Sequence, residues 1–357
     1  MLSSLAGFVG ESMTKARTKQ RVLCALFCAV VICGPIWGQE MQTGFAGAPT
    51  RRGGAGQTGL IQAMSESPFQ MDYEGRIYFE EGTDQPTRDL RWYEHSLRFQ
   101  TRLREEETSD LALYMNLKWL DFNDVNLRLP KSGAAFPDDL YDVGLGMLWR
   151  KRLGGDRMIN ARLGVSSPSD KPFSSFDEVA FHLDFDYTVP WRDDLSWVFM
   201  MSYASDRELN FPLPGVAAKW QPSDRFTAII GVPVVAVNWR PRPGWTVRAS
   251  YMIPRTVHAK VSCEVLQDVK LYGAFDCDGQ QYFRHDRFDE HDRLQYYEKR
   301  AMLGLTWQVT PGCTVDLGGG YAFGRFWFEE SSYDERGESR IDLDDGPFAL
   351  LRVNLRF

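Results

Sequence analysis

The chain has 357 residues, 43% of them hydrophobic and 13% aromatic, and its formal net charge is −7. This composition supports a large buried core in one or two domains and excludes a chain that is disordered throughout. The acidic balance argues against nucleic acid as a partner.

The first segment has the features of a signal peptide. Basic residues at positions 15, 17, 19 and 21 precede an apolar run over residues 22–37. This run is shorter than the roughly 20 residues that span a bilayer as a helix. We therefore predict a signal peptide over residues 1–38, cleaved near Gly38. Cleavage removes four basic residues and one acidic residue, which takes the net charge from −7 to −10.

Two further segments are predicted after the cleavage site. Residues 39–69 are rich in Gly, Ala and Gln without sustained periodicity, so we expect a flexible periplasmic tail there. Residues 70–357 form the predicted folded domain. After cleavage this chain keeps Cys263, Cys277 and Cys313, an odd number without metal-ligand spacing, which indicates no disulfide framework.

From about residue 71 onward, apolar and polar residues alternate. In residues 178–189 one face would carry Val179, Phe181, Leu183, Phe185, Tyr187 and Val189, and the other Ala180, His182, Asp184, Asp186 and Thr188. A period of two is typical of strands and incompatible with a helix. Residues 110–119, 245–253 and 256–265 repeat the pattern.

The connectors divide into short turns and long polar loops. Short ones occur at 153–156, 190–194, 221–224, 240–244, 266–268 and 310–312, and long ones near 124–138, 168–177, 277–292 and 329–346. This alternation predicts an up-and-down antiparallel meander. Many runs reach ten residues, which favours transmembrane strands over the shorter strands of a sandwich, and no fixed repeat indicates a propeller.

The predicted fold is therefore all-β: an up-and-down antiparallel transmembrane β-barrel of about 14 strands, within 12 to 16. Tryptophans near the segment ends are typical of an aromatic girdle, namely Trp119, Trp149, Trp239, Trp245 and Trp307. The mean hydropathy of −0.35 agrees with strands that are polar on one face. Residues 229–237 pivot at Pro233 and leave two alternatives open, one bent strand or an incomplete hairpin.

The last residues of the sequence show the alternation most clearly. Leu351, Val353, Leu355 and Phe357 would face lipid, and Arg352, Asn354 and Arg356 would face the lumen. We expect this strand to close the barrel against the first one, near Met71 or Leu90. We also expect deletion of Phe357 to lower assembly into the membrane.

Four stretches carry a resemblance to a known family: FPDDLYDVGLGMLWRK (136–151), SDKPFSSFDEVAF (169–181), FPLPGVAAKW (211–220) and GGGYAFGRFWFE (318–329). They resemble an uncharacterised family of predicted bacterial outer-membrane β-barrel proteins, a domain of unknown function, over about residues 70 to 357. The resemblance implies a place in the bacterial outer membrane. The terminal apolar alternation also resembles the signal that barrel-assembly machinery recognises. No activity or catalytic residue is implied.

Charged residues on the predicted inner face form the first candidate site. They are Lys118, Arg150, Arg162, His182, Asp184, Asp186, Arg248, His258, Lys260, Glu264, Arg300, Asp316 and Arg352. One interpretation is a water-filled pore whose charged walls select solutes. The other is a closed lumen in which these charges pair with one another. The mixed charges leave ion preference open.

Two other groups of residues are weaker candidates. The segment 277–293 holds His285, Asp286, Asp289, Glu290, His291 and Asp292, but it lacks the order of a known metal loop, so we predict no metal and no cofactor. His182 and Asp184 share a face without an identifiable serine, and His95 and Ser96 point to opposite faces. We therefore predict no catalytic residue and no enzymatic activity.

The predicted function is a passive, porin-like channel for small hydrophilic solutes. The alternative is a non-conducting structural or surface-recognition barrel that acts through its long acidic loops. A weaker alternative is a barrel-embedded enzyme that acts on lipids. The expected partners are outer-membrane lipid, the barrel-assembly machinery and small solutes, and not nucleic acid.

Overall fold

The computed structural model describes residues 67–85, 89–123, 127–206, 211–253, 255–332 and 340–357. The predicted signal peptide, and the predicted tail up to residue 66, lie outside these ranges. Among the described residues, no helix is long and apolar enough to cross a membrane.

The described residues form 17 strands and one 3-10 helix. They are β1 (Phe69–Gly82), β2 (Asp89–Glu105), β3 (Ser109–Asn123), β4 (Asp139–Leu153), β5 (Arg157–Ser169), η1 (Phe176–Glu178), β6 (Ala180–Arg192), β7 (Leu195–Ala204), β8 (Leu213–Ser223), β9 (Phe226–Val232), β10 (Val234–Trp239), β11 (Trp245–Met252), β12 (Thr256–Leu266), β13 (Val269–Tyr282), β14 (Arg293–Thr310), β15 (Cys313–Glu330), β16 (Arg340–Leu343) and β17 (Gly346–Arg356).

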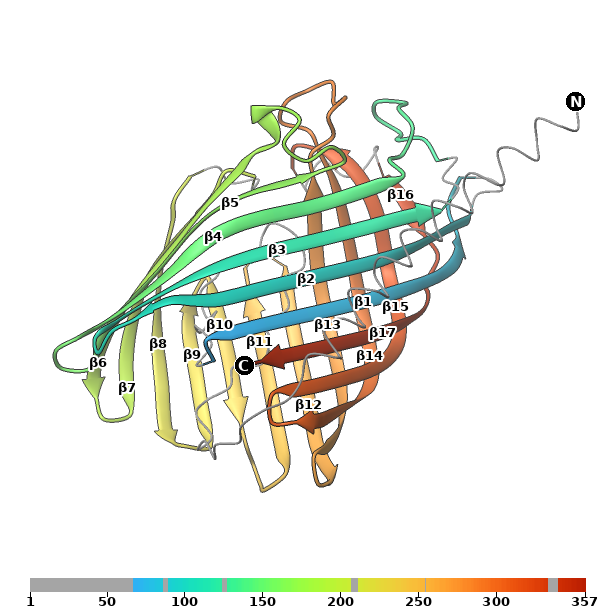
Figure 1. The fold of residues 1–357 in the computed structure, drawn as a ribbon. Coiled ribbons are helices and arrows are strands. Elements are labelled where there is room, and N and C mark those ends of the chain that lie inside the picture. The colour runs from blue at the N-terminus through green and yellow to red at the C-terminus, as the bar shows by residue number, and fades with distance from the viewer. Residues whose placement is uncertain (1–66, 86–88, 124–126, 207–210, 254, 333–339) are drawn as a thin grey trace, which may run out of the picture. The chain divides into compact units, whose positions relative to one another are not determined.

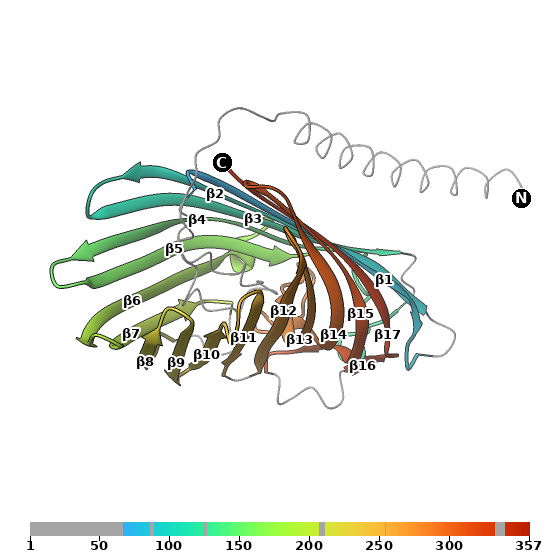
Figure 2. The ribbon, with the colours of Figure 1, turned by 90° about the horizontal axis from the view of Figure 1, so that it is seen from below.

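The strands close into one antiparallel barrel (Figures 1 and 2). Each strand from β1 to β14 pairs with the next along the chain, β15 pairs with β17, and β17 returns to β1. Sixteen strands form this ring, and the short β16 pairs with one end of β15. The predicted up-and-down barrel is thus confirmed, with a strand number at the upper limit of the predicted range.

At two segments the structure refines the strand boundaries expected from the sequence. β9 and β10 pair antiparallel on either side of Pro233, so this segment is a short hairpin and not one bent strand. Residues 277–282, which we placed in a polar loop, belong to β13 because they pair in register with residues 294–299 of β14. Both segments lack the long alternating run that the other strands show, and backbone pairing decides their structure.

The barrel closes where β17 meets β1. Met71 pairs with Leu355 and Gly75 with Leu351, which agrees with the predicted closure near Met71. The Phe69 N–H donates to the Phe357 carbonyl oxygen at 3.2 Å, and the Phe357 N–H donates to the Phe69 carbonyl oxygen at 3.0 Å. Because β17 also pairs with β15, its centre is hydrogen-bonded on both edges.

Proline at the centre of β17 should prevent closure. Leu351 lies opposite both Gly75 and Leu317, so the change Leu351→Pro removes an N–H that belongs to one of the two ladders. We expect a large loss of the folded, heat-modifiable band on unheated gels of the membrane fraction. Leu351→Val is the matched control and should assemble normally. Equal folded fractions for the two variants would contradict a closure that depends on β17.

The two faces of the sheet differ in chemistry. Outward-facing apolar side chains are widely exposed, for example Leu163 at 59%, Ile230 at 58% and Leu303 at 74%. The predicted girdle residues Trp149, Trp239, Trp245 and Trp307 stand near the short turns, and Trp119 stands near the opposite end of β3. An apolar band between aromatic residues is the outer surface of a membrane barrel.

Candidate functional site in the barrel lumen

The structure places the predicted lumen residues on the inner face, alternating with the exposed apolar residues of the same strands. These are Lys118, Arg150, Arg162, His182, Asp184, Asp186, Arg248, His258, Lys260, Glu264, Arg300, Asp316 and Arg352. Their burial varies over the inner face. Lys118, Arg162, Asp184, Arg300 and Asp316 are at most 8% exposed, and the others are more accessible to water.

A buried charge network occupies the long-loop half of the lumen. Arg300, Glu298 and Arg76 are 0%, 1% and 2% exposed, although they face the inside of a barrel. The Tyr78 hydroxyl donates to a Glu298 carboxylate oxygen at 2.8 Å, and Arg300 pairs with the same carboxylate. Arg76 Nη1 donates to Glu94 Oε2 at 2.7 Å. Charges this deeply buried need partners, so the network is a packed interior.

Two more of the predicted lumen cations are packed away from water. Lys118 Nζ lies 3.2 Å from Glu94 Oε1. The Arg162 guanidinium lies 4.3 Å from the centroid of the Tyr114 ring and 4.0 Å from the Asp184 carboxylate. Each is 4% exposed, so these cations contribute to wall packing and not to a water-filled surface.

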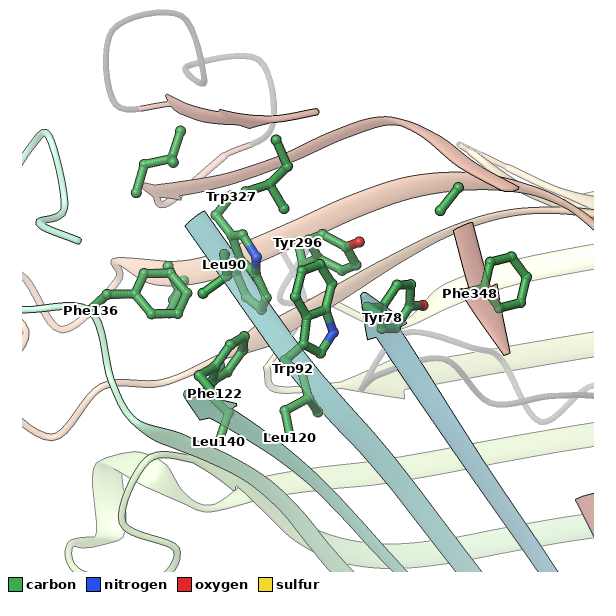
Figure 3. Packing of buried hydrophobic residues seen from close by; sticks show 14 of the residues in the cluster. Tyr78, Leu90, Trp92, Leu120, Phe122, Phe136, Leu140, Tyr296, Trp327 and Phe348 are labelled. Atoms are coloured by element: carbon green, nitrogen blue, oxygen red, sulfur yellow. The ribbon is translucent and has the colours of Figure 1, made fainter. Parts of the chain in front are cut away.

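Aromatic side chains from strands four places apart in the ring meet above this network (Figure 3). Trp92 of β2 and Tyr296 of β14 have ring centroids 5.8 Å apart. Phe122 of β3 and Trp327 of β15 are 5.7 Å apart, although β2, β1 and β17 separate their strands in the ring. Edge-to-face contacts of this kind add to the stability gained by burial. The inner faces of β14, β15 and β1 to β3 are therefore packed together at this level.

Residues 127–136, which we call the cap loop, fold onto this aromatic cluster. Leu127, Leu129 and Phe136 are 0–2% exposed, and the Phe136 ring lies 5.3 Å from Trp327 (Figure 3). The Phe136 N–H donates to the Leu127 carbonyl oxygen at 3.0 Å, which holds the loop as a small hairpin. A loop that we read as polar thus contributes three apolar side chains to the interior.

Ion pairs fasten the cap loop to its neighbours. Lys131 Nζ lies 2.8 Å from both the Asp292 and the Glu330 carboxylates. Burial acts to lower the pKa of Lys131, but hydrogen bonds and the charges of these two acids outweigh it and raise that pKa above its ordinary value. Lys131 therefore stays charged throughout the neutral pH range, and its contribution is lost only in strongly alkaline solution.

Another part of the inner face, on β12 and β17, is more accessible to water. The side chains of Lys260, His258 and Arg352 are 33%, 24% and 20% exposed. Lys260 Nζ lies 3.4 Å from Asp316, and His258 Nδ1 lies 2.9 Å from Asp276. This part has the mixed, partly hydrated charges of an aqueous wall.

The remaining predicted residues lie on the same accessible wall. Arg150 Nε donates to Asn160 Oδ1 at 3.3 Å, and Asn160 Nδ2 donates to Asp186 Oδ2 at 2.8 Å. Arg248 is half-buried on β11, and Glu264 is exposed near the turn between β12 and β13. Together they line the lumen without converging on one point.

His182 has a serine partner that the sequence did not reveal. Ser166 of β5 lies diagonally across from it, with Oγ 2.8 Å from His182 Nε2. The Asp206 carboxylate lies 3.9 Å from His182 Nδ1, which is beyond hydrogen-bond distance. The serine is 5% exposed. These residues have the types found in a hydrolytic triad but not its orienting hydrogen bond.

The histidines of segment 277–293 do not form a shared centre. Asp170, His285 and Asp286 have ligand atoms within 4.8 Å of one another. Lys171 Nζ lies 2.7 Å from His285 Nε2, and Arg284 Nη2 lies 2.6 Å from Asp286. Arg284 therefore engages a carboxylate oxygen of this group, and Lys171 contacts the His285 nitrogen that faces away from the two carboxylates.

The sequence reasoning missed the cap loop and an apolar patch on the inner face. The patch consists of Met200, Ala217 and Val234, with Val198, Ile229 and Met252 packed against them. Its signal was present in VFMMSYA and IIGVPVVAV, where inward and outward positions are both apolar. For the cap loop, the contact partners lie far away in the sequence, so no local pattern marks it.

The fold and its inner face define a transmembrane β-barrel of the outer-membrane type, with a packed cluster under the long loops and a charged inner face that is partly accessible to water. No family model matches the sequence, and no curated protein matches it. The barrel is similar to solved outer-membrane proteins. One is an outer membrane channel from Pseudomonas putida F1, with a TM-score of 0.36 at 8% identity over 84% of this chain and 99% of the other.

Two others have similar scores. The toluene transporter TodX of Pseudomonas putida has a TM-score of 0.38 at 8% identity, over 85% of this chain and 94% of the other. The FrpB iron transporter of Neisseria meningitidis has a TM-score of 0.35 at 8% identity, over 84% of this chain and 82% of the other. At such values the similarity carries no argument about function.

Proposed function

We propose that this protein is a passive channel of the bacterial outer membrane for small hydrophilic solutes. The observation that carries the proposal is the hydrated, charged inner wall around Lys260, His258 and Arg352 in a ring of sixteen strands. Rings of about this size leave room for an aqueous path in porins.

The cap loop acts as the barrier at the long-loop end. It covers the aromatic cluster, so solute movement at this end depends on the cap loop or on a path beside it. The buried side chains of Leu127, Leu129 and Phe136 and the ion pairs of Lys131 with Asp292 and Glu330 hold it in place. Such an inward-folded loop sets conductance without changing the barrel.

Single-channel recording in a planar bilayer tests this function. We expect discrete conductance steps, and Lys260→Gln should shift ion selectivity toward cations because it removes a hydrated positive charge from the wall. Arg104→Gln is the matched control, since this arginine is 70% exposed near the turn between β2 and β3. Purified, folded protein that never gives steps would exclude the channel function.

The burial of lumen residues near the long loops favours a second candidate function. A barrel whose strands meet inside through Trp92, Tyr296, Phe122 and Trp327 could serve as a non-conducting surface element, acting through its long acidic loops. The same recordings separate the two functions. Folded protein without conductance, but with loop-dependent surface binding, would support this second candidate.

The proposal also includes how the chain reaches the membrane and which partners it has. We propose that a cleaved signal peptide directs the chain across the inner membrane, and that the barrel-assembly machinery recognises the strand ending in Leu351, Val353, Leu355 and Phe357. We assign no catalysis to His182, because its carboxylate neighbour lies beyond hydrogen-bond distance. The partners are membrane lipid and small solutes, with no nucleic acid.

A further inference from the structure

The barrel wall is low on one side. β9, β10 and β11 have 7, 6 and 8 residues, whereas β13, β14 and β15 have 14, 18 and 18. Figure 1 shows these short strands (yellow) ending well below the tips of β13–β15. Membrane strands usually need roughly 9–11 residues to cross the hydrocarbon layer.

The height of this wall can be estimated from Trp239, which marks its lower end. Trp239, 46% exposed, ends β10 near the short turns, and the hairpin turns over at Pro233. At about 3.3 Å per residue β10 is about 20 Å long, and at a usual tilt of about 40° it rises about 15 Å. The apolar band of such barrels is about 25 Å tall. The hairpin tip therefore ends inside the hydrocarbon layer.

Both faces of the low wall are apolar near its tip. Ile230, Val232 and Val235 face outward and are 58%, 59% and 44% exposed. The inner face at the same level carries the apolar patch, in which Val234 pairs with Met252. An aqueous pore does not require an apolar patch on its wall. A filled core would bury Ile229 and Met252, which pack against the patch but are partly exposed. The apolar surface thus continues over the rim from the bilayer into the lumen.

Positive charge lies below the patch. The charged residues of β8 to β11 are Lys219 and Arg248, both half-buried on the inner face, and the strands carry no acid. Lys219 is two positions from Ala217, toward the short turns. Lys260 continues the basic side of the lumen on β12, opposite Arg248. A molecule that crosses the rim meets apolar side chains first and cations next.

We propose that the β9–β10 hairpin is a lateral port, through which single-chain amphiphiles with an anionic carboxylate head pass from the outer leaflet into the lumen. The acyl chain lies on the apolar patch and the carboxylate on Lys219 and Arg248. The port bypasses the cap loop, because it opens below the packed aromatic cluster. Onward passage through the lumen rests on the proposed channel function, whereas binding at the port does not.

Photo-crosslinking tests the port. Dodecanoate with a terminal diazirine is added to the full-length protein in liposomes, and the adducts are located by mass spectrometry. We expect adducts at inner-face residues such as Met200 and Met252, lost on competition with unlabelled dodecanoate. Adducts confined to outer-face residues such as Ile230 and Val235 would overturn the proposal, because simple contact with the bilayer predicts them. If neither inner-face nor outer-face residues are labelled, a second copy of the chain covers the wall. This result would also overturn the proposal.

Two variants sharpen the test. Insertion of about four strand-forming residues on each side of Pro233 brings both strands to the usual membrane length. This should abolish inner adducts and keep outer ones. Lys219→Gln combined with Arg248→Gln should weaken labelling by the carboxylate probe severalfold and leave a trimethylammonium probe of equal length unchanged. Inner labelling that survives the raised wall would overturn the lateral route.

Conductance of the same preparation separates the two proposals. Adducts at inner-face residues without conductance would support the lateral port and exclude the channel function. Conductance with outer adducts alone would keep the channel and exclude the port.

Discussion

Glu298→Gln should destabilise the barrel by about 3–5 kcal/mol, the usual cost of removing one partner from a buried ion pair. Glu298 is 1% exposed and pairs with Arg300, which is itself 0% exposed. Its carboxylate also accepts hydrogen bonds from the Tyr78 and Tyr296 hydroxyls at 2.8 Å and 3.0 Å. Glutamine keeps the volume but leaves the guanidinium without its counter-charge. The midpoint of urea unfolding, followed by tryptophan fluorescence in liposomes, measures the loss.

A surface pair provides the matched control. Arg104 and Glu106 form an ion pair near a short turn, with side chains 70% and 46% exposed. Because water screens this pair, Glu106→Gln should leave the midpoint nearly unchanged. Equal midpoints for Glu298→Gln and the wild type would show that the network is hydrated and that the upper lumen is not packed.

A double substitution distinguishes lost charge pairing from lost packing. Glu298→Leu with Arg300→Met removes both charges and keeps apolar volume. We expect it to be more stable than Glu298→Gln, since no uncompensated charge remains. If the double variant were the less stable one, the hydrogen bonds of Tyr78 and Tyr296 would be the dominant contribution of Glu298.

The sequence predicted the architecture because every membrane strand must present one apolar face. The alternation in residues 178–189 and 351–357 could therefore be assigned to two faces without a structure. Strand number was harder to predict because β9 and β10 are too short for a clear period, and their hairpin turns at a single proline. Local pattern and backbone pairing also disagree at residues 277–282, the polar end of β13.

The state of the lumen could not be predicted from the same pattern. Alternation marks Lys118 and Lys260 as inward residues, but it cannot tell that the first is 4% exposed and that the second is 33% exposed. That difference depends on height in the barrel and on what lies opposite, for example Trp327 of β15 against Phe122 of β3. Contacts across a lumen join residues about 200 positions apart, and no local signal encodes them.

Removing the cap loop should raise single-channel conductance severalfold. In this variant a short Gly-Ser linker replaces residues 127–136, which removes Leu127, Leu129 and Phe136 from the aromatic cluster. The strands keep their pairing, since β3 and β4 are in register over residues 109–121 and 139–151 without the loop. The lumen then loses one of the segments that cover its long-loop end, while residues 283–292, whose backbone bonds to Pro168 and Asp170, remain in place. Recordings in planar bilayers, beside wild-type protein from the same preparation, measure the change.

Lys131→Glu tests the same barrier without deleting any residue. Its result therefore does not depend on whether the deletion variant folds. It places a third negative charge beside Asp292 and Glu330, so the cap loop should detach at neutral pH without any loss of chain. We expect larger conductance steps or longer openings, and restoration of wild-type behaviour when Asp292→Lys is added. Folded variants with wild-type conductance would place the barrier in the wall itself, at the contacts of Trp92 with Tyr296 and of Phe122 with Trp327. The lumen would then be closed at its upper end by residues that cannot move away, and the low wall at β9–β10 would be the remaining route from the outer side.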